Sequence, residues 1–265
     1  MSQASASAVC HGQTRNANST FSDGHLNIAE GNYEARFALT AGEIASALRL
    51  RHNVFTVEIG GDVRTDPGLE FDAYDFRSRH LIVVDRETGD TVGTYRLNTI
   101  ETAGDTHGFY SSNEFSIGDL PPDVLKNGIE IGRACVAKEH RNTKVLFLLW
   151  KGLLRYLETS RKRYFFGCCS MFTQDQKQGA AAYYQLRRDG HLHDKYLLTP
   201  KKNRIDLSND SVGKVELPSL FNMYLRIGAK VCGPPMIDRE FGTIDFFVLF
   251  DVTKMNAKYR RMFAA

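Results

Sequence analysis

The chain has 265 residues and a formal net charge of +3, with 42% apolar and 25% charged residues. This composition is typical of a globular protein, and the small net charge argues against a nucleic-acid partner. No window of about 20 apolar residues predicts a transmembrane helix, and the first 30 residues lack a secretory signal. The five cysteines have no framework spacing, which favours a reducing, cytoplasmic location.

The first 30 residues differ in composition from the rest of the chain. They are rich in Ser, Ala, Asn and Gly, so residues 1–30 are expected to form a disordered or loosely held arm. No linker follows, which predicts one domain over residues 31–265. A strand is expected at 33–39, and Thr40 with Glu43 predicts a capping box at the start of a helix.

An acidic segment follows this helix. Residues 58–75 carry six acidic side chains against one arginine. Such an excess of negative charge predicts either a solvated loop or a pocket for a cationic substrate. The six acids are Glu58, Asp62, Asp66, Glu70, Asp72 and Asp75.

The middle of the chain predicts alternating strands and helices. Segments 80–85 and 91–97 are expected to form antiparallel strands joined by a tight turn. Residues 129–159 predict a strand, a polar turn and a long helix that is apolar nearly all round, as buried helices are. The amides at the start of such a helix can bind a phosphate. Further elements are expected at 164–170 and 244–250 (strands) and at 176–188 and 217–227 (helices).

Four motifs follow one another in an order known from an enzyme family. They are residues 51–55 (RHNVF), 70–75 (EFDAYD), 92–97 (VGTYRL) and 130–133 (EIGR). Their order resembles that of the acyl-homoserine-lactone synthases and their relatives in the GNAT acyltransferase superfamily. The downstream segments 140–157, 164–170 and 217–251 more closely resemble the ornithine-lipid N-acyltransferases, which are sometimes labelled haemolysin-like.

The resemblance covers roughly residues 33–251 and implies a fold. The expected fold is a single GNAT-like domain of the α/β (α+β) class. Its central sheet is mixed, mostly antiparallel and twisted, with a splay, and helices flank both faces.

The resemblance also implies an activity. The expected enzyme moves a (3-hydroxy) fatty acyl group from an acyl-carrier-protein thioester to the α-amino group of ornithine, forming lyso-ornithine lipid. Its donor is the acyl-phosphopantetheine of the carrier protein, and no tightly bound cofactor is expected. The histidines and cysteines show no metal-ligand pattern, so no metal site is expected either.

The expected donor site is the turn that leads into the long helix. Many GNAT proteins carry glycines in this turn, but here it reads Arg141, Asn142, Thr143, Lys144 and Val145. Without glycine the backbone cannot closely approach a bulky pyrophosphate, which favours the single phosphate of a carrier protein over coenzyme A. Residues 138–163 carry eight basic side chains against two acidic ones, which suits an acidic carrier protein or an ordinary solvated face.

Glu130 and Arg133 are the candidate catalytic residues. Attack of an amine on a thioester needs a group that takes the amine's proton and donors for the oxyanion. Glu130 is the expected base, directly or through water; a structural salt bridge to Arg133 is the alternative. The two side chains of a regular strand at this spacing point to opposite faces. A bulge near Gly132 is expected to turn both toward the cleft and to free a backbone amide.

The expected acceptor site uses residues of the other motifs. Asp72 and Asp75 match acidic positions of the related synthases and are candidates to hold the ammonium groups of an amino acid, with ornithine favoured. Arg51 and Arg96, together with Arg133, are expected to hold these acids in place or to bind the acceptor carboxylate. A buried ion network that closes the N-terminal lobe over the sheet is the alternative.

Other readings of the sequence stay open. The same chemistry on another amine would produce an N-acyl amino acid or an acyl-homoserine lactone, and a membrane-active haemolysin without catalysis is a third possibility. The tail at 254–263 is basic and contains aromatic and Met residues. It is expected to be either a frayed terminus or a peripheral contact with the anionic inner membrane.

Overall fold

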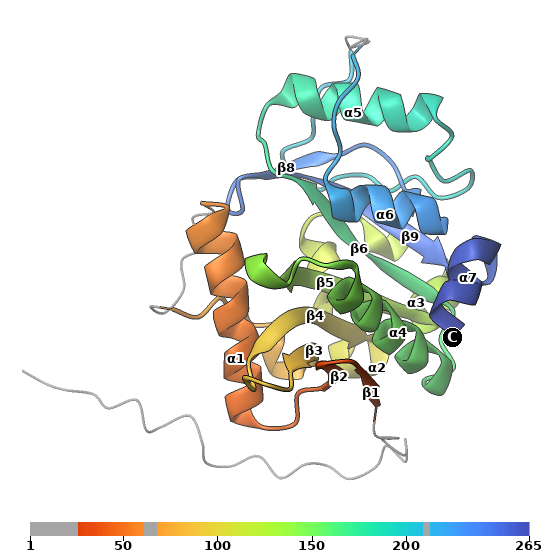
Figure 1. Cartoon of the computed structure of the whole chain (residues 1–265). Coiled ribbons are helices and arrows are strands. Elements are labelled where there is room, and N and C mark those ends of the chain that lie inside the picture. Colours follow the sequence, from red (N-terminus) through yellow and green to blue (C-terminus); the bar gives the residue numbers. More distant parts are fainter. Residues whose placement is uncertain (1–25, 61–67, 209–212, 265) are drawn as a thin grey trace, which may run out of the picture.

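One twisted sheet organises the molecule. The computed structural model describes residues 26–60, 68–208 and 213–264, which form a sheet of nine strands with helices on both sides (Figure 1). The strands are β1 (Asn27–Glu30), β2 (Tyr33–Phe37), β3 (Arg79–Asp85), β4 (Thr91–Thr99), β5 (Gly128–Val136), β6 (Tyr164–Met171), β7 (Lys230–Val231), β8 (Met236–Asp238) and β9 (Thr243–Asp251). The α-helices are α1 (Ala41–His52), α2 (Ile100–Ala103), α3 (Pro122–Lys126), α4 (Thr143–Thr159), α5 (Gln176–Arg188), α6 (Ser219–Ile227) and α7 (Ala257–Ala264).

The sheet opens between β5 and β6. The strand order is β1-β2-β3-β4-β5-β6-β9-β7, with β8 also paired to β9, and every pair is antiparallel except β5 with β6. The β5–β6 ladder joins only three residue pairs and ends at Glu130 and Phe166. β6 instead pairs with β9 along its whole length. The predicted mixed, mostly antiparallel sheet with a splay is therefore confirmed.

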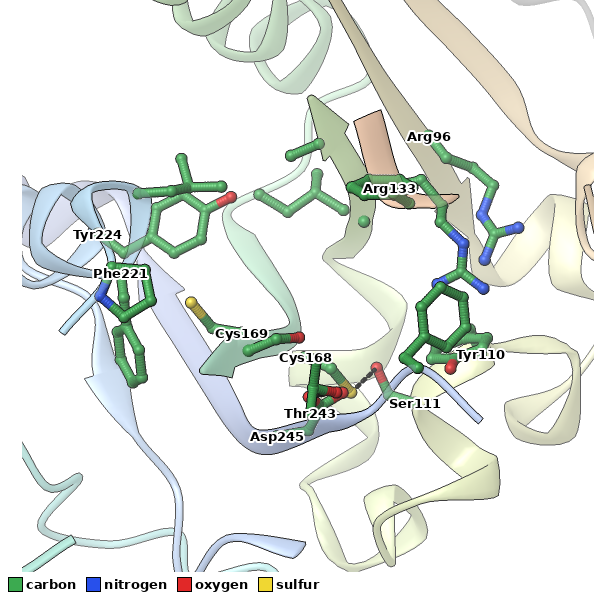
Figure 2. A pocket seen from close by; sticks show the side chains of 18 of the residues that line it. Arg96, Tyr110, Ser111, Arg133, Cys168, Cys169, Phe221, Tyr224, Thr243 and Asp245 are labelled. Carbon is green, nitrogen blue, oxygen red and sulfur yellow. Dashed lines mark hydrogen bonds between the residues drawn. The ribbon is translucent and has the colours of Figure 1, made fainter. Parts of the chain in front are cut away.

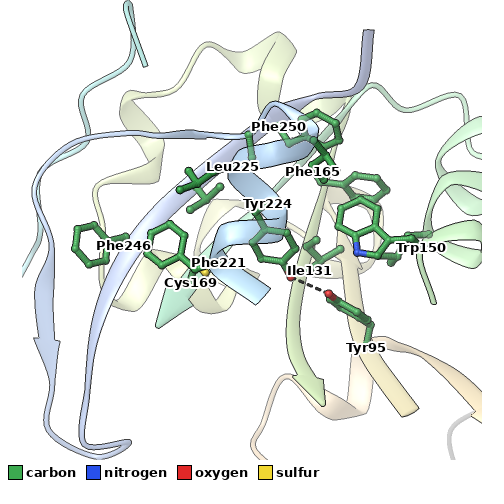
Figure 3. Close-up of a cluster of buried hydrophobic side chains, with 14 of the residues drawn as sticks. Tyr95, Ile131, Trp150, Phe165, Cys169, Phe221, Tyr224, Leu225, Phe246 and Phe250 are labelled. Carbon is green, nitrogen blue, oxygen red and sulfur yellow. Dashed lines mark hydrogen bonds between the residues drawn. The ribbon is translucent and has the colours of Figure 1, made fainter. Parts of the chain in front are cut away.

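Side chains alternate between two cores on the two faces of the sheet. Tyr95 and Leu97 of β4 join the core under α4, which also holds Trp150 and Phe221. Figure 3 shows this cluster, in which the Tyr95 and Tyr224 hydroxyls lie 2.9 Å apart. Phe109, Phe166 and Phe247 belong to a second core with residues of α3. Each face of the sheet thus buries its own apolar layer. Arg96 lies between Tyr95 and Leu97 on β4, so its side chain points to the opposite face of the sheet and is available to build a site.

The sequence predicted most elements close to their observed bounds. The capping box of Thr40 and Glu43 is present at α1, and α5 spans the predicted residues. β1 lies inside the segment for which an N-terminal arm was expected, so that strand pairing begins earlier than composition suggests. Residues 1–25, where the rest of the arm was expected, lie outside the described residues.

The C-terminal segment folds back on α4. The Phe263 ring of α7 stacks on Trp150 and Phe147, with ring centroids 5.8 and 5.3 Å apart. The expectation of a frayed terminus is therefore wrong for α7, because its aromatic residues complete the apolar cover of α4. Among the described residues, no helix has the length and apolar character needed to cross a bilayer.

Candidate active site

A cavity passes through the opening between β5 and β6. It measures about 1100 Å³, including the part open to solvent. Arg96 and Arg133 line it on one side, and Phe221 and Tyr224 of α6 line it on the other (Figure 2). Glu130 is also a lining residue. The cavity therefore joins a charged chamber to an apolar one.

A β-bulge brings the two candidate catalytic residues together. The register between β4 and β5 shifts by one residue, because Thr94 pairs with Cys135 while Arg96 pairs with Gly132. Arg133 lies inside the bulge with a φ of 50°, a left-handed backbone conformation that residues other than glycine seldom adopt. The expected bulge near Gly132 is confirmed, and both Glu130 and Arg133 face the cavity.

Glu130 is held by the segment that covers the charged chamber. Its Oε1 accepts hydrogen bonds from the Ser111 backbone amide at 2.8 Å and the Ser111 hydroxyl at 2.7 Å. Its Oε2 accepts one from the Tyr110 amide at 3.0 Å. Burial raises the pKa of Glu130, and the hydrogen bonds from Ser111 offset part of this rise. Oε2 keeps acceptor capacity for a proton, but the role of Glu130 as a base stays a prediction.

Arg133 does not pair with Glu130. Its Nε donates to Glu70 Oε1 and its Nη2 to Asp72 Oδ2, both at 3.0 Å. The guanidinium also lies over the rings of Tyr110 and Phe241, at 4.5 and 4.3 Å from their centroids. These contacts hold the strained backbone at the bulge.

The acids and arginines of the motifs form one buried ion network. Arg51 donates from Nε to Glu70 and from its two Nη atoms to Asp75, at 2.7 and 3.1 Å. Arg96 Nη1 donates to Asp72 Oδ1 at 2.6 Å. Burial opposes the ionisation of Asp75, yet the bonds and charge of Arg51 and Arg96 hold its pKa well below its ordinary value. Each acid thus has an arginine partner.

In this network the arginines hold the acids in place, which is one of the two roles expected for them. Arg51 is fully buried, and the residues that line the cavity do not include Arg51, Asp72 or Asp75. Their carboxylates are occupied by guanidinium groups rather than aimed at a ligand, so the structure supports the alternative of an ion network. Only Arg96 of this group borders the cavity. Asp62 and Asp66 of the acidic segment lie outside the described residues.

A second group of acidic residues was not predicted from the sequence, and we call it the distal acid cluster. It consists of Glu114, Cys168 and Asp245, whose ligand atoms lie within 4.8 Å of one another. Burial and the neighbouring acids raise the pKa of Glu114 well above its ordinary value, and burial raises that of Asp245 to about 6. Asp245 was the feature of the sequence that could have revealed this cluster. It is the one acid inside the apolar strand IDFFVLF, and burying an unpaired acid costs free energy, so its presence there points to a function.

The expected donor residues lie apart from the cavity lining. The Asn142 side chain caps α4 and accepts hydrogen bonds from the amides of Lys144 and Val145, at 3.0 and 3.1 Å. Val145 is fully buried in the core, so its side chain cannot meet a donor in this conformation. Arg141 forms a bidentate pair with Glu58. Thr143 and Lys144 are exposed beside them.

Comparisons with known proteins place the chain in a family. The Acetyltransferase (GNAT) domain model matches residues 50–151. The L-ornithine N(alpha)-acyltransferase of Rhizobium meliloti is 31% identical over 251 residues, which cover 88% of this chain and 85% of that protein. The chain belongs to the L-ornithine N(alpha)-acyltransferase family. A member from Brucella abortus is 30% identical over 254 residues, covering 89% of this chain and 90% of that protein.

The fold of this acyltransferase also occurs in a solved structure. FeeM, described as an N-acyl amino acid synthase from uncultured soil microbes, superposes with a TM-score of 0.51 and 9% sequence identity. The match covers 83% of this chain and 92% of FeeM. At this identity the likeness shows a shared fold alone.

In this acyltransferase the geometry fits a two-substrate reaction. The sheet opens between β5 and β6 beyond Glu130 and Phe166, where the ladder between the two strands ends. The apolar chamber at α6 suits an acyl chain, and the charged chamber suits a polar acceptor.

Proposed function

We propose that this chain transfers an acyl group from the phosphopantetheine thioester of acyl-carrier protein to the α-amino group of L-ornithine. The observation that carries the proposal is the cavity through the splay, with the Glu130 carboxylate in its wall, in a chain of this family. The product would be N-acyl-ornithine, the lyso form of ornithine lipid, and the free thiol of the carrier protein.

Glu130 starts the proposed reaction by removing a proton from the acceptor. The α-ammonium of an amino acid has a pKa near 8, so a base must take its proton before the nitrogen can attack. Oε2 is the available oxygen, because Oε1 already accepts two hydrogen bonds from Ser111. A buried carboxylate with a raised pKa takes a proton more readily than an exposed one.

The free amine then attacks the thioester carbonyl. A C–N bond forms and the carbonyl oxygen becomes an oxyanion, for which a β5 backbone amide at the splay is the proposed donor. Collapse of this intermediate breaks the C–S bond, the extra proton on the nitrogen passes to the thiolate, and Glu130 returns the first proton to solvent. No metal or second cofactor enters these steps.

The donor is proposed to dock at the start of α4. Lys138 and Lys144 are exposed there, and exposed basic side chains attract an acidic carrier protein through long-range charge. The product would be delivered to a membrane, and the exposed Lys258 and Arg261 of α7 are the proposed peripheral contact with its anionic surface. If wild type sediments with anionic vesicles and K258E/R261E sediments less, this contact is supported. Equal sedimentation of wild type and K258E/R261E would refute it.

The experiment that tests the function uses purified protein. It is incubated with acyl-carrier-protein or coenzyme A thioesters and with ornithine or other amino acids, and the products are read by mass spectrometry. We expect N-acyl-ornithine from the carrier-protein donor, and a loss of about 10²–10⁴-fold in turnover for Glu130→Gln with donor binding retained. Full activity of E130Q would exclude Glu130 as the base, and a product with another amine alone would exclude ornithine.

A further inference from the structure

The charged chamber of the cavity has two ends of opposite sign. Arg96 and Arg133 border one end, and Cys168 and Asp245 border the other (Figure 2). Ser111 connects the two, since its Oγ lies 2.7 Å from Glu130 Oε1 and 3.6 Å from Cys168 Sγ. A ligand at Glu130 would therefore have positive groups on one side and the distal acid cluster on the other.

The distal acid cluster differs from the ion network in having no ion pair among the described residues. Within residues 26–60, 68–208 and 213–264, no ion pair reaches Glu114 or Asp245, whereas Glu70, Asp72 and Asp75 each pair with arginine. Glu114 is 2% exposed and its Oε2 has no hydrogen-bond partner. Asp245 is 4% exposed, and its Oδ1 accepts a hydrogen bond from the Thr243 hydroxyl at 2.8 Å.

Two close, buried carboxylates without a counter-ion are costly. Each disfavours the charge of the other, and burial removes the water that would stabilise it. Glu114 and Asp245 therefore bind protons more tightly than exposed acids do. A bound cation would remove both penalties at once, because it pairs with the two acids in a site of low dielectric.

We propose that the distal acid cluster receives the side-chain ammonium of the acceptor and thereby selects a cationic amino acid. Asp245 borders the cavity and meets the ammonium directly, while Glu114 lies behind it and offers a second carboxyl group. This inference rests on the proposed function and names the residues that decide its acceptor. The α-amino group then lies toward Glu130, and the carboxylate toward Arg133.

A divalent metal is the competing occupant. The cluster offers one thiol and two carboxylates within the described residues. Burial and the neighbouring acids raise the pKa of the Cys168 thiol well above its ordinary value, so it stays protonated near neutral pH. The three side chains are fewer than the ligands that fill a structural zinc site or a calcium site, which makes an ammonium the better match.

Acceptor selectivity tests the proposal directly. Ornithine is compared with norvaline, which has the same carbon chain and no side-chain amine, for wild type, Asp245→Asn and Glu114→Gln. We expect the KM for ornithine to rise about tenfold or more in both variants while the rate with norvaline is unchanged. Asp251→Asn on the same strand is the matched control, because Asp251 pairs with Arg163 away from the cavity. An unchanged ornithine preference in D245N and E114Q would overturn the proposal.

Calorimetric binding separates this inference from the proposed function. If wild type binds ornithine, D245N does not, and no acyl transfer to ornithine occurs, the cation site stands and the proposed reaction fails. If wild type acylates ornithine and D245N binds it equally well, the reaction stands and the site fails. Tight binding of Zn²⁺ or Mg²⁺ alone that is lost in D245N would overturn the ammonium assignment in favour of a metal.

Discussion

Ser111 donates both its backbone amide and its hydroxyl to the same oxygen of Glu130, at 2.8 and 2.7 Å. The two residues are 19 positions apart, on a short 3₁₀ turn and on β5. This contact orients the carboxylate and leaves Oε2 with one partner, the Tyr110 amide. Ser111 is therefore a positioning residue for the proposed base.

Removal of the Ser111 hydroxyl should move the pH profile of the enzyme. The hydroxyl stabilises the charged form of Glu130, so Ser111→Ala should raise the pKa of Glu130 further above its ordinary value. We expect the acid limb of kcat/KM to shift upward by about one pH unit, because one hydrogen bond to a charged group is worth about 1.5–3 kcal/mol. Ser112→Ala is a suitable control, since the Ser112 hydroxyl donates to the Phe109 carbonyl instead. An acid limb that stays in place would show that Glu130 does not govern the profile.

Loss of Arg51 should destabilise the fold strongly. Arg51→Ala leaves Glu70 and Asp75 buried without a direct partner on that side, which costs about 3–5 kcal/mol. Urea unfolding measures the free energy of unfolding. Arg163→Ala, which removes a half-exposed pair with Asp251, should cost far less. Similar losses in both variants would contradict a structural role for the buried network.

Neutralising Asp245 should stabilise the free enzyme at alkaline pH. Its pKa is raised from 3.8 to about 6, so the native state holds the proton more tightly than the unfolded chain does. This contribution to stability is present below pH 3.8 and is lost as the pH rises through about 6. Asp245→Asn should therefore raise the free energy of unfolding at pH 8, by on the order of 1–3 kcal/mol, and have little effect near pH 4. Urea unfolding at the two pH values measures this difference in the free energy of unfolding. A D245N variant that is less stable than wild type at pH 8 would contradict the prediction.

Reversal of charge at the start of α4 should affect only the carrier-protein donor. Lys138→Glu with Lys144→Glu should raise the KM for acyl-carrier protein about tenfold at low salt and leave kcat unchanged. The difference should fade at about 0.5 M salt, where the Debye length is only a few Å. Lys177→Glu on α5 is the control, since this exposed lysine lies on another helix. The proposed docking site would be refuted if K138E/K144E and K177E raised the KM for acyl-carrier protein equally, or if neither variant raised it.

The order of the motifs allowed part of the site to be predicted. The sequence placed Glu130 and Arg133 on one strand with a bulge near Gly132, and both face the cavity in the structure. It did not decide which acids are free to bind a ligand. Asp72 and Asp75 were favoured because they match acidic positions of the related synthases, but Arg51, Arg96 and Arg133 reach them from other elements.

The sequence by itself determined the local elements of this protein, since apolar periodicity and the Thr40 cap act over a few residues. Only the tertiary structure decided how charges pair, because an ion pair depends on distance in space and not on spacing along the chain. Glu114 follows a 3₁₀ turn, Cys168 lies on β6 and Asp245 lies on β9, and no local pattern links them. The pairing of β6 with β9 brings Cys168 and Asp245 together next to the cavity, and within the described residues neither Glu114 nor Asp245 has an ion pair with an arginine.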